Sequence, residues 1–404
     1  GGAAGGFAEV DERSEVLGGE PTLEAVAERL KNGTYRNVVV LAGAGMSVSA
    51  GIPDFRTPGT GLYSRLDALG LPTPEAVFDI DFFKSNPTPF NTLARELWPH
   101  AGRHRPTPTH CFLRLLELKG VLRRVYTQNI DGLEFLAGME GESVLQAHGG
   151  FGAAHCVACR AAADPADVRA ALLAGETPTC DRCGGLTKPA ITFFGESLPP
   201  RFKALHKEDM EAADLLLVIG TSLKVAPVAG LISMVGPLCA RVLINRDFVA
   251  TAPETPGGFE IAADDNYRDV AALGDCDDVV STLCALADWG DEFAAIRAIV
   301  DEMCDASAVD EEDEGGVGGG ASVISPAVTE AAPAAAGGGG AAAVSATTAA
   351  ATAAAAADAG DGAAPGAPPP PEAGSGGDAG SAGLAPPPVR VGGFAEDEEK
   401  TSGD

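Results

Sequence analysis

The sequence predicts an α/β protein with a doubly wound parallel sheet, a smaller helical and zinc-ribbon domain, and a disordered C-terminal tail. The first observation is a set of four short apolar runs, at residues 37–43, 121–129, 214–222 and 240–247. Runs with so little alternation are typical of parallel strands that are buried on both faces. The second is a helical pattern at 110–120, which lies between two of the runs as a crossover helix does. The third is two Cys-x-x-Cys pairs, at a spacing typical of zinc sites.

Along the chain, composition changes mark the expected domains. We expect a flexible leader at 1–20, a folded domain at 21–300 and a disordered tail at 301–404. The folded domain would have a large Rossmann-like part (21–52, 101–150 and 191–300) and a small part made of two insertions (53–100 and 151–190).

The first helix is predicted at residues 21–33. Leu23, Val26, Ala27 and Leu30 share one face of that helix, and Asn32-Gly33 supplies the stop. The insertion that follows the first predicted strand holds Pro, Phe and Trp in short helical pieces.

Charge and hydropathy exclude several classes of partner. The formal net charge is −29, and residues 301–404 carry 18 acidic but only 2 basic residues among Ala, Gly and Pro tracts. Such a tail has too few large apolar side chains to form a buried core, so it is predicted to be disordered. An acidic chain binds the phosphate backbone poorly, so we expect no sequence-specific contact with nucleic acid. No apolar run approaches the roughly 20 residues of a membrane span, so no membrane contact is expected.

The expected compartment is the cytoplasm, the nucleus or both. The first residues have neither the basic region nor the apolar core of a secretory signal. Because the sequence does not begin with Met, a mitochondrial location stays open.

All four predicted strands end in small or polar residues. These ends are Gly43-Ala44-Gly45, Gln128-Asn129-Ile130-Asp131, Gly220-Thr221-Ser222 and Asn245-Arg246-Asp247. Open α/β sheets bind ligands outside the carboxyl ends of their strands. The four ends therefore predict one shared crevice.

The Gly-x-Gly at Gly43 and Gly45 is the first motif with a chemical meaning. Glycines after a strand let a backbone approach a pyrophosphate closely. Gly51 comes too late to be the third glycine of the ordinary dinucleotide fingerprint, and no acidic residue follows at the usual distance. The motif alone leaves a phosphate site and a structural turn open.

The cysteine pairs are Cys156 with Cys159 and Cys180 with Cys183. Four thiolates complete a tetrahedral shell and leave no open position, so the pattern predicts one structural zinc ion. Unliganded buried thiols are the alternative.

His148, before two glycines, is a candidate general base, because its ordinary pKa lies near neutral pH. A structural role is the alternative. In the segment 188–199, apolar and aromatic residues run directly into Gly-Glu-Ser, which suggests a strand-like ligand edge or an ordinary buried strand with a turn.

Taken together, these motifs resemble the sirtuins, the NAD-dependent protein-lysine deacylases. GAGMSVSAGIPDFR, YTQNIDGLE, QAHGG, FFGESLP, GTSLKVAPV and LINRD occur in the family's order across residues 22–300. The resemblance is to the branch of cytosolic and mitochondrial deacetylases, and it implies a sirtuin catalytic domain.

The resemblance implies roles for particular residues. His148 would be the base and Asn129 a second catalytic residue, while Ile191, Thr192 and Phe193 would line the acyl-lysine channel. The remaining residues would bind NAD: Ala44, Gly45, Ser47, Asp54, Phe55, Arg56, Gln128, Asn129, Asp131, Gly220, Thr221, Ser222, Asn245, Arg246 and Cys276.

The implied reaction consumes NAD. An acyl-lysine amide oxygen would attack the ribose carbon as nicotinamide leaves, and the acyl group would end on ADP-ribose. Histones, tubulin-like proteins and metabolic enzymes are all open as substrates. Mono-ADP-ribosyl transfer to protein and a weakly catalytic NAD- or acyl-peptide-binding scaffold are the alternative functions.

The sequence departs from the family pattern at three positions: Gly150, Ala190 and Thr192. Phe78, Ile80, Phe82 and Phe83 predict an apolar acyl pocket, which favours acetyl or longer fatty acyl groups over acidic ones.

Overall fold

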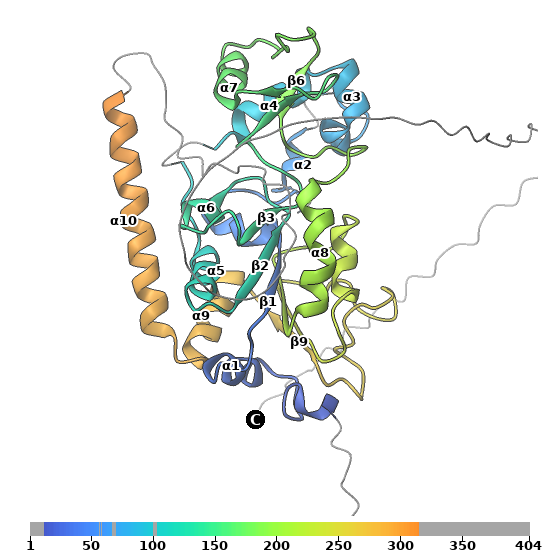
Figure 1. Ribbon diagram of the computed structural model, residues 1–404, viewed down its shortest axis with the longest axis vertical. Helices are drawn as coiled ribbons and strands as arrows, with labels where there is room; N and C mark the ends of the chain where they lie inside the picture. The colour runs from blue at the N-terminus through green and yellow to red at the C-terminus, as the bar shows by residue number, and fades with distance from the viewer. Residues whose placement is uncertain (1–11, 56, 58, 67–69, 100–102, 315–404) are drawn as a thin grey trace, which may run out of the picture. The chain divides into compact units, whose positions relative to one another are not determined.

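The computed structural model describes residues 12–55, 57, 59–66, 70–99 and 103–314 (Figure 1). Its main sheet has six parallel strands in the order β3-β2-β1-β7-β8-β9. Their bounds are β1 Val38–Ala42, β2 Leu122–Thr127, β3 Val144–Gln146, β7 Leu215–Ile219, β8 Ala240–Asn245 and β9 Asp269–Leu273. The predicted doubly wound sheet is confirmed. The four predicted strands are β1, β2, β7 and β8, and each observed strand is shorter than the predicted run.

Strand order reverses at the centre of this sheet. β1 pairs in parallel with β2 on one side and with β7 on the other. Where the order reverses, the connections that follow the two neighbouring strands run in opposite directions. This opens a crevice at the carboxyl ends of those strands. Gly43 follows β1 and Gly220 follows β7, so the Gly-x-Gly turn and the Gly-Thr-Ser turn meet there.

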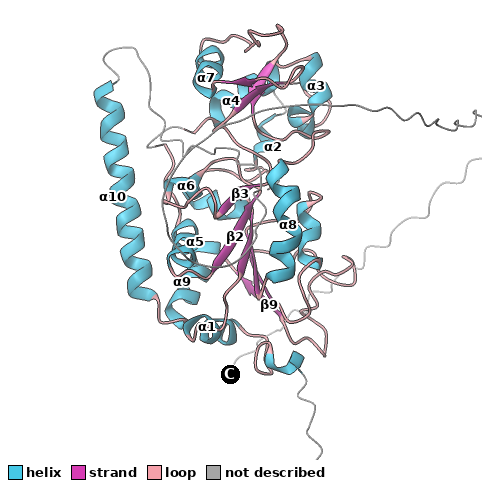
Figure 2. Ribbon diagram, viewed as in Figure 1, coloured by secondary structure: helices cyan, strands magenta, loops and turns pink. Residues whose placement is uncertain are grey.

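Helices cover both faces of the main sheet (Figure 2). One face packs on α1 (Leu23–Lys31), α5 (Pro108–Leu118), α9 (Cys276–Leu286) and α10 (Gly290–Glu314). The other face packs on α8 (Pro200–Ala212) and the 3₁₀ helix η5 (Val228–Ser233). All five residues of β1 and of β7 are buried, as strands between two helical layers must be.

Local sequence explains where the first helices begin. Thr22 precedes α1, and its hydroxyl accepts a hydrogen bond from the Ala25 N–H at 3.2 Å. Thr107 precedes α5 in a reciprocal cap with His110, and Pro108 occupies the first helical turn, where no backbone donor is needed. Thr107 and Pro108 lie just before the start predicted for that helix.

The two insertions share one separate core. Their second sheet is antiparallel, in the order β5-β4-β6, with β4 Ala154–Cys156, β5 Ala162–Ala163 and β6 Thr187–Pro189. Its helices are α2 Leu62–Arg65, η4 Pro74–Phe78, α3 Ile80–Ser85, α4 Thr88–Leu97 and α7 Pro165–Leu173. Phe90 belongs to the first insertion, and Phe193 lies just after the second. Their ring centroids are 4.7 Å apart, so Phe193 completes the core of the first insertion. The remaining short helices are η1 Glu12–Glu15, η2 Ala44–Ala50 and α6 Leu133–Leu136.

Both ends of the folded part differ from the sequence expectation. Within the predicted leader, η1 forms and Leu17 is buried in the core. At the other end, α10 continues to Glu314, past the predicted boundary at residue 300. Phe293, Ile296, Val300 and Cys304 recur at helical spacing and are buried, which keeps the helix on the core. Residues 1–11 of the leader and 315–404 of the tail lie outside the described residues.

Among the described residues, the helices are too short or too polar to cross a membrane.

Candidate active site

Three glycines bring two strand ends into backbone contact. A Cβ on Gly43 would lie 2.6 Å from Thr221 Cβ, and one on Gly45 would lie 2.7 Å from Gly220 Cα. Gly220 also has a φ of +61°, where other residues are strained, and its Cβ would meet Met46 N at 2.5 Å. The Gly45 N–H donates to the Gly220 carbonyl at 2.7 Å. This cradle at the strand-order reversal has no room for side chains, so the two turns can lie this close only with glycine at these positions.

A cavity of about 940 Å³ opens beside the cradle. Most of the residues predicted to bind NAD or the acyl-lysine substrate line it: Ala44, Gly45, Asp54, Phe55, Gln128, Asn129, His148, Ile191, Thr192, Phe193, Gly220, Thr221, Ser222, Asn245, Arg246 and Cys276. Segments more than 200 residues apart in sequence thus meet at one place. Ser47 and Asp131 are not among the lining residues, and Arg56 lies outside the described residues.

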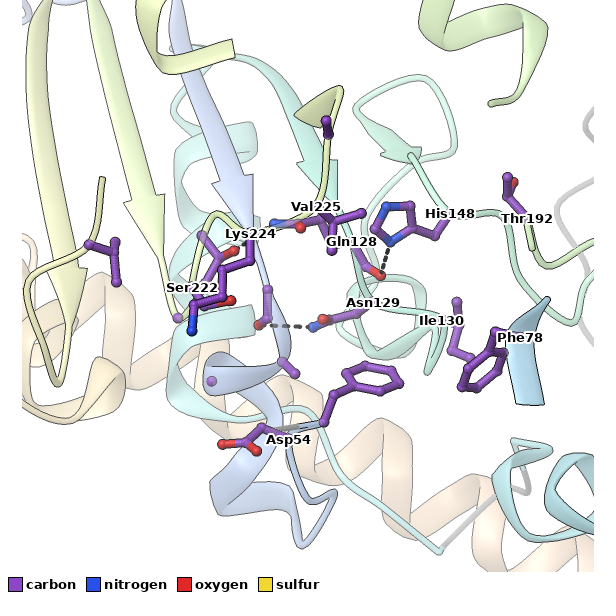
Figure 3. A pocket seen from close by; sticks show the side chains of 18 of the residues that line it. Asp54, Phe78, Gln128, Asn129, Ile130, His148, Thr192, Ser222, Lys224 and Val225 are labelled. Atoms are coloured by element: carbon purple, nitrogen blue, oxygen red, sulfur yellow. Dashed lines mark hydrogen bonds between the residues drawn. The ribbon is translucent and has the colours of Figure 1, made fainter. Parts of the chain in front are cut away.

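Ser47 and Asp131 lie behind the cavity wall and hold Asn129. The Asn129 side-chain amide donates to the Gly43 carbonyl and to Ser47 Oγ, each at 3.2 Å. Ser47 Oγ in turn donates to Asp131 Oδ2 at 2.8 Å. Two hydrogen bonds therefore orient the Asn129 side chain, and Figure 3 shows one of them. In this structure Ser47, itself bonded to Asp131, positions a lining residue.

His148 lines the cavity, and one of its ring nitrogens is bonded to the backbone at Gln128 (Figure 3). Its Nδ1 lies 3.0 Å from the Gln128 carbonyl oxygen, which can only accept, so Nδ1 carries the proton of the neutral ring. Nε2 is buried and has no hydrogen-bond partner among the described residues. Burial lowers the pKa of His148 below the usual value, although the bond to Gln128 opposes that shift. At neutral pH the ring is thus uncharged, with the lone pair on Nε2.

Gly149 fixes the loop that carries His148. Its φ is +66°, and a Cβ at this position would lie 1.9 Å from the Ala190 carbonyl oxygen. The loop therefore touches the backbone that leads into the predicted acyl-lysine segment.

Replacing Gly149 with alanine is expected to reduce activity strongly, because neither the φ angle nor the 1.9 Å approach tolerates a methyl group. Steady-state kinetics and thermal melting would measure the effect, with Gly152→Ala as the matched control. A Cβ on Gly152 meets nothing within 4 Å. Equal kinetics for the two variants would contradict the close packing of this loop.

The predicted acyl pocket is only partly as expected. Of its four predicted residues, Phe78 lines the cavity, whereas Ile80, Phe82 and Phe83 do not. Phe83 instead packs against Phe193 in the core of the small part, with ring centroids 5.5 Å apart. The sequence pattern showed that these positions are apolar but not which of them face inward.

The four predicted zinc ligands converge. The sulfurs of Cys156, Cys159, Cys180 and Cys183 all lie within 4.8 Å of one another. The Cys156–Cys183 and Cys159–Cys180 sulfur distances are 3.5 and 3.8 Å. Zinc–sulfur bonds of about 2.3 Å at tetrahedral angles place sulfurs roughly 3.8 Å apart. The cluster is therefore compatible with one structural zinc ion.

Cys180→Ser is expected to lower the zinc content well below one ion per chain and to reduce the melting temperature. Metal binding contributes free energy to folding, typically about 10 kcal/mol or more for a structural zinc. Elemental analysis and thermal melting would measure both quantities, with Cys304→Ser, outside the cluster, as the control. Full zinc content in the Cys180 variant would contradict the assignment.

Sequence reasoning missed a buried polar cluster behind Asp131. His110, Asp131 and Glu134 each offer a ligand-type atom within 4.8 Å of the others. Burial, with the nearby Asp131 charge, raises the pKa of Glu134 to about 8, and burial lowers the pKa of His110 to about 4. The missed signal was spacing: Glu134 lies three residues after Asp131, in the first turn of the short helix α6.

Comparison with known proteins identifies a family and several relatives of this chain. The model of the Sir2 family matches residues 43–227. The NAD-dependent protein deacetylase sirtuin-2 of Danio rerio is 46% identical over 305 residues, which is 72% of this chain and 80% of that protein. The chain belongs to the Sir2 family. The resemblance to sirtuins is thereby confirmed.

Two further sirtuins show similar agreement. The NAD-dependent protein deacetylase hst2 of Schizosaccharomyces pombe is 46% identical over 270 residues, 67% of this chain and 77% of that protein. The NAD-dependent protein deacetylase sirtuin-3 of Mus musculus is 45% identical over 291 residues, 72% and 82% of the two chains. The family match includes the glycine cradle, His148 and the four cysteines, whereas Asn245, Arg246 and Cys276 follow it.

Proposed function

We propose that this sirtuin is an NAD-dependent protein-lysine deacetylase that transfers the acyl group of a lysine side chain to ADP-ribose. The observation that carries the proposal is the position of His148. Its unprotonated Nε2 is buried without a partner among the described residues, and the ring lines the same cavity as the glycine cradle. A neutral histidine beside a cavity of about 940 Å³ is an arrangement that this reaction requires.

NAD would bind along the carboxyl edge of the main sheet. Gly45 and Gly220 form the close-approach surface for its phosphates, and Thr221 is fixed by a hydrogen bond from Gln128 Nε2 at 2.7 Å. Asn245 and Arg246, at the end of β8, would contact the adenosine half, and Cys276 lines the cavity at the start of α9. When bound, NAD supplies an activated ribose carbon from which nicotinamide can leave.

His148 would accept a proton from a ribose hydroxyl. The hydrogen bond from Nδ1 to Gln128 keeps the ring in the tautomer whose Nε2 can take that proton. Asn129, held by Ser47 and the Gly43 carbonyl, would orient the ribose next to the base. Phe55, which lines the same cavity, would exclude water from the reacting carbon.

The acyl-lysine would enter past Ile191, Thr192 and Phe193. The Thr192 N–H donates to the His148 carbonyl at 2.8 Å, which ties this segment to the base. Its own carbonyl accepts no hydrogen bond among the described residues and is available to the substrate amide N–H. Phe78 and Ile130 add apolar surface, which suits an uncharged acyl group.

The substrates would be proteins with acylated lysines, consistent with the protein deacetylases to which the chain is similar. The acidic composition favours Lys-rich segments as the recognised sequences. Cytoplasmic or nuclear location stays a prediction, which imaging of the tagged full-length chain would check.

The proposal is tested by incubating the protein with an acetyl-lysine peptide, with and without NAD, and analysing the products by mass spectrometry. Deacetylated peptide together with nicotinamide and O-acetyl-ADP-ribose, formed only with NAD, supports it. ADP-ribosylated protein would instead indicate mono-ADP-ribosyl transfer. An unchanged peptide across acetyl, butyryl and myristoyl forms would leave a binding role and overturn the proposal.

A further inference from the structure

A lysine that is completely buried lies at the end of the cysteine-bearing sheet. Lys188 is on β6 and is 0% exposed. Its ammonium donates to the Ile191 carbonyl, lies 2.9 Å from Glu196 Oε2, and sits 4.2 Å from the centre of the Phe193 ring. A buried charge is costly unless it is paired, so each of these contacts constrains the others.

Glu196 uses both carboxylate oxygens. Oε2 takes the Lys188 contact and also accepts the Phe193 N–H at 3.0 Å, while Oε1 accepts from Arg160 Nη1 at 3.3 Å. The Glu196 side chain is only 6% exposed, although Arg160 is 63% exposed. Glu196 therefore joins a buried cation, a surface cation and a backbone amide.

Together these groups hold alternate positions of the predicted acyl-lysine segment. Lys188 binds the carbonyl of Ile191, and Glu196 binds the N–H of Phe193. In an extended chain, residues two apart present the same side. The carbonyl of the intervening Thr192 is left without a partner among the described residues, and Thr192 lines the cavity.

The same groups also reach the cysteine cluster. Arg160 directly follows Cys159, at a φ of +58°. On the other side, Lys188 pairs across the sheet with His155, next to the pairing of Cys156 with Thr187. Both cations thus come from backbone that the four cysteines organise.

We propose that Lys188, Glu196 and Arg160 form a positioning array that fixes the acyl-lysine segment 190–194 to the cysteine-bearing module. The array touches neither the glycine cradle nor His148 directly. It sets the position of the Thr192 carbonyl and so controls acyl-lysine affinity rather than NAD affinity. This inference deepens the proposed function, since it assumes that segment 190–194 binds the acyl-lysine.

The experiment compares Glu196→Gln, Lys188→Met and Arg160→Gln in the full-length chain. Binding of a fluorescent acetyl-lysine peptide is measured by anisotropy, together with kcat and with KM for NAD and for the peptide. Glu196→Gln is expected to weaken peptide binding by about tenfold, the effect of losing one charge-assisted hydrogen bond, and to leave KM for NAD unchanged. Arg160→Gln, at the exposed end, would give a smaller effect of the same kind.

Hydrogen exchange provides a readout that does not need activity. The Phe193 amide, bound to Glu196 Oε2, is expected to exchange faster in Glu196→Gln and Lys188→Met than in the wild type. Lys84→Met, which breaks an exposed pair with Asp81, is the control and should change nothing. Zinc content and melting temperature show whether each variant folds.

The outcomes separate the two proposals. Faster exchange at 190–196 in a chain that shows no deacetylase activity would keep the array and overturn the proposed function. Unchanged exchange and unchanged peptide affinity in an active chain would overturn the array. Equal losses of NAD and peptide affinity would show a general structural role and would also overturn it.

Discussion

His148→Ala is expected to lower kcat/KM for an acetyl-lysine peptide by about 10²–10⁴-fold, the usual effect of removing a general base. The ring is held by the Gln128 carbonyl at Nδ1, and no other described group offers a buried, unpaired ring nitrogen to the cavity. Steady-state kinetics with mass spectrometry of the products would measure the loss. His206→Ala is the matched control, because His206 also lines the cavity but is bonded through Nδ1 to its own helix at Phe202.

The pH dependence gives a second measurement on the same residue. Burial lowers the pKa of His148, so the ring stays neutral at a pH at which a free histidine, with a pKa of about 6.5, is half protonated. Since the base must be neutral, the acid limb of the kcat/KM profile is expected to be centred below pH 6.5. An acid limb centred above pH 7, or full activity in the alanine variant, would contradict the role of His148.

How much of this site could be predicted from the sequence depends on how far apart in the sequence the interacting residues lie. The cysteine cluster was predictable because each pair is local and its spacing fits one metal. The crevice was predictable because parallel strands place their carboxyl ends at the same edge, so polar residues after β1 and β7 must meet. Neither prediction depends on how the side chains pack.

The roles of Ser47 and Asp131 were less predictable. Their motifs placed them near the ligand, but the structure sets them behind Asn129, bonded to each other at 2.8 Å. They are 84 positions apart in the sequence, with the first insertion between them. No local pattern shows which of two neighbouring polar side chains faces the cavity.

Sequence reasoning did not predict β3, β9 or the end of α10, for different physical reasons. β3 has only three residues, too few for a pattern, and the sequence of β9, Asp-Val-Ala-Ala-Leu, has small side chains and an acid at its start. The end of α10 was hidden because its acidic surface resembles the composition of the tail, although its buried face keeps helical spacing through Cys304. Composition therefore did not distinguish the end of this helix from the segment that follows it.

A buried ion pair that sequence reasoning missed joins β8 to β9. Arg241 and Asp269 are each 1% exposed and form a bidentate ion pair, with Nε–Oδ1 at 2.6 Å. Arg241 also donates to the carbonyls of Ile232, Gly257 and Gly258. An arginine in an apolar run would ordinarily be placed at a strand end, and its partner lies 28 residues away.

Asp269→Ala is therefore expected to lower the free energy of unfolding by about 3–5 kcal/mol, because it leaves the Arg241 guanidinium buried without its counter-charge. Urea denaturation would measure the change. Asp81→Ala, which removes one partner of an exposed ion pair, is the control and should cost less than about 1 kcal/mol.

The double variant Arg241→Met/Asp269→Leu separates pairing from packing. If the loss in Asp269→Ala comes from an uncompensated charge, replacing both groups with apolar side chains should recover most of the stability. The carbonyls of Gly257 and Gly258 would still lose a donor, so the loop from Arg246 to Arg268 is expected to stay looser than in the wild type. Because Arg246 begins that loop, KM for NAD should rise in the double variant even when stability returns. Recovery of stability with an unchanged KM for NAD would show that the pair holds the sheet alone and not the NAD end of the cavity.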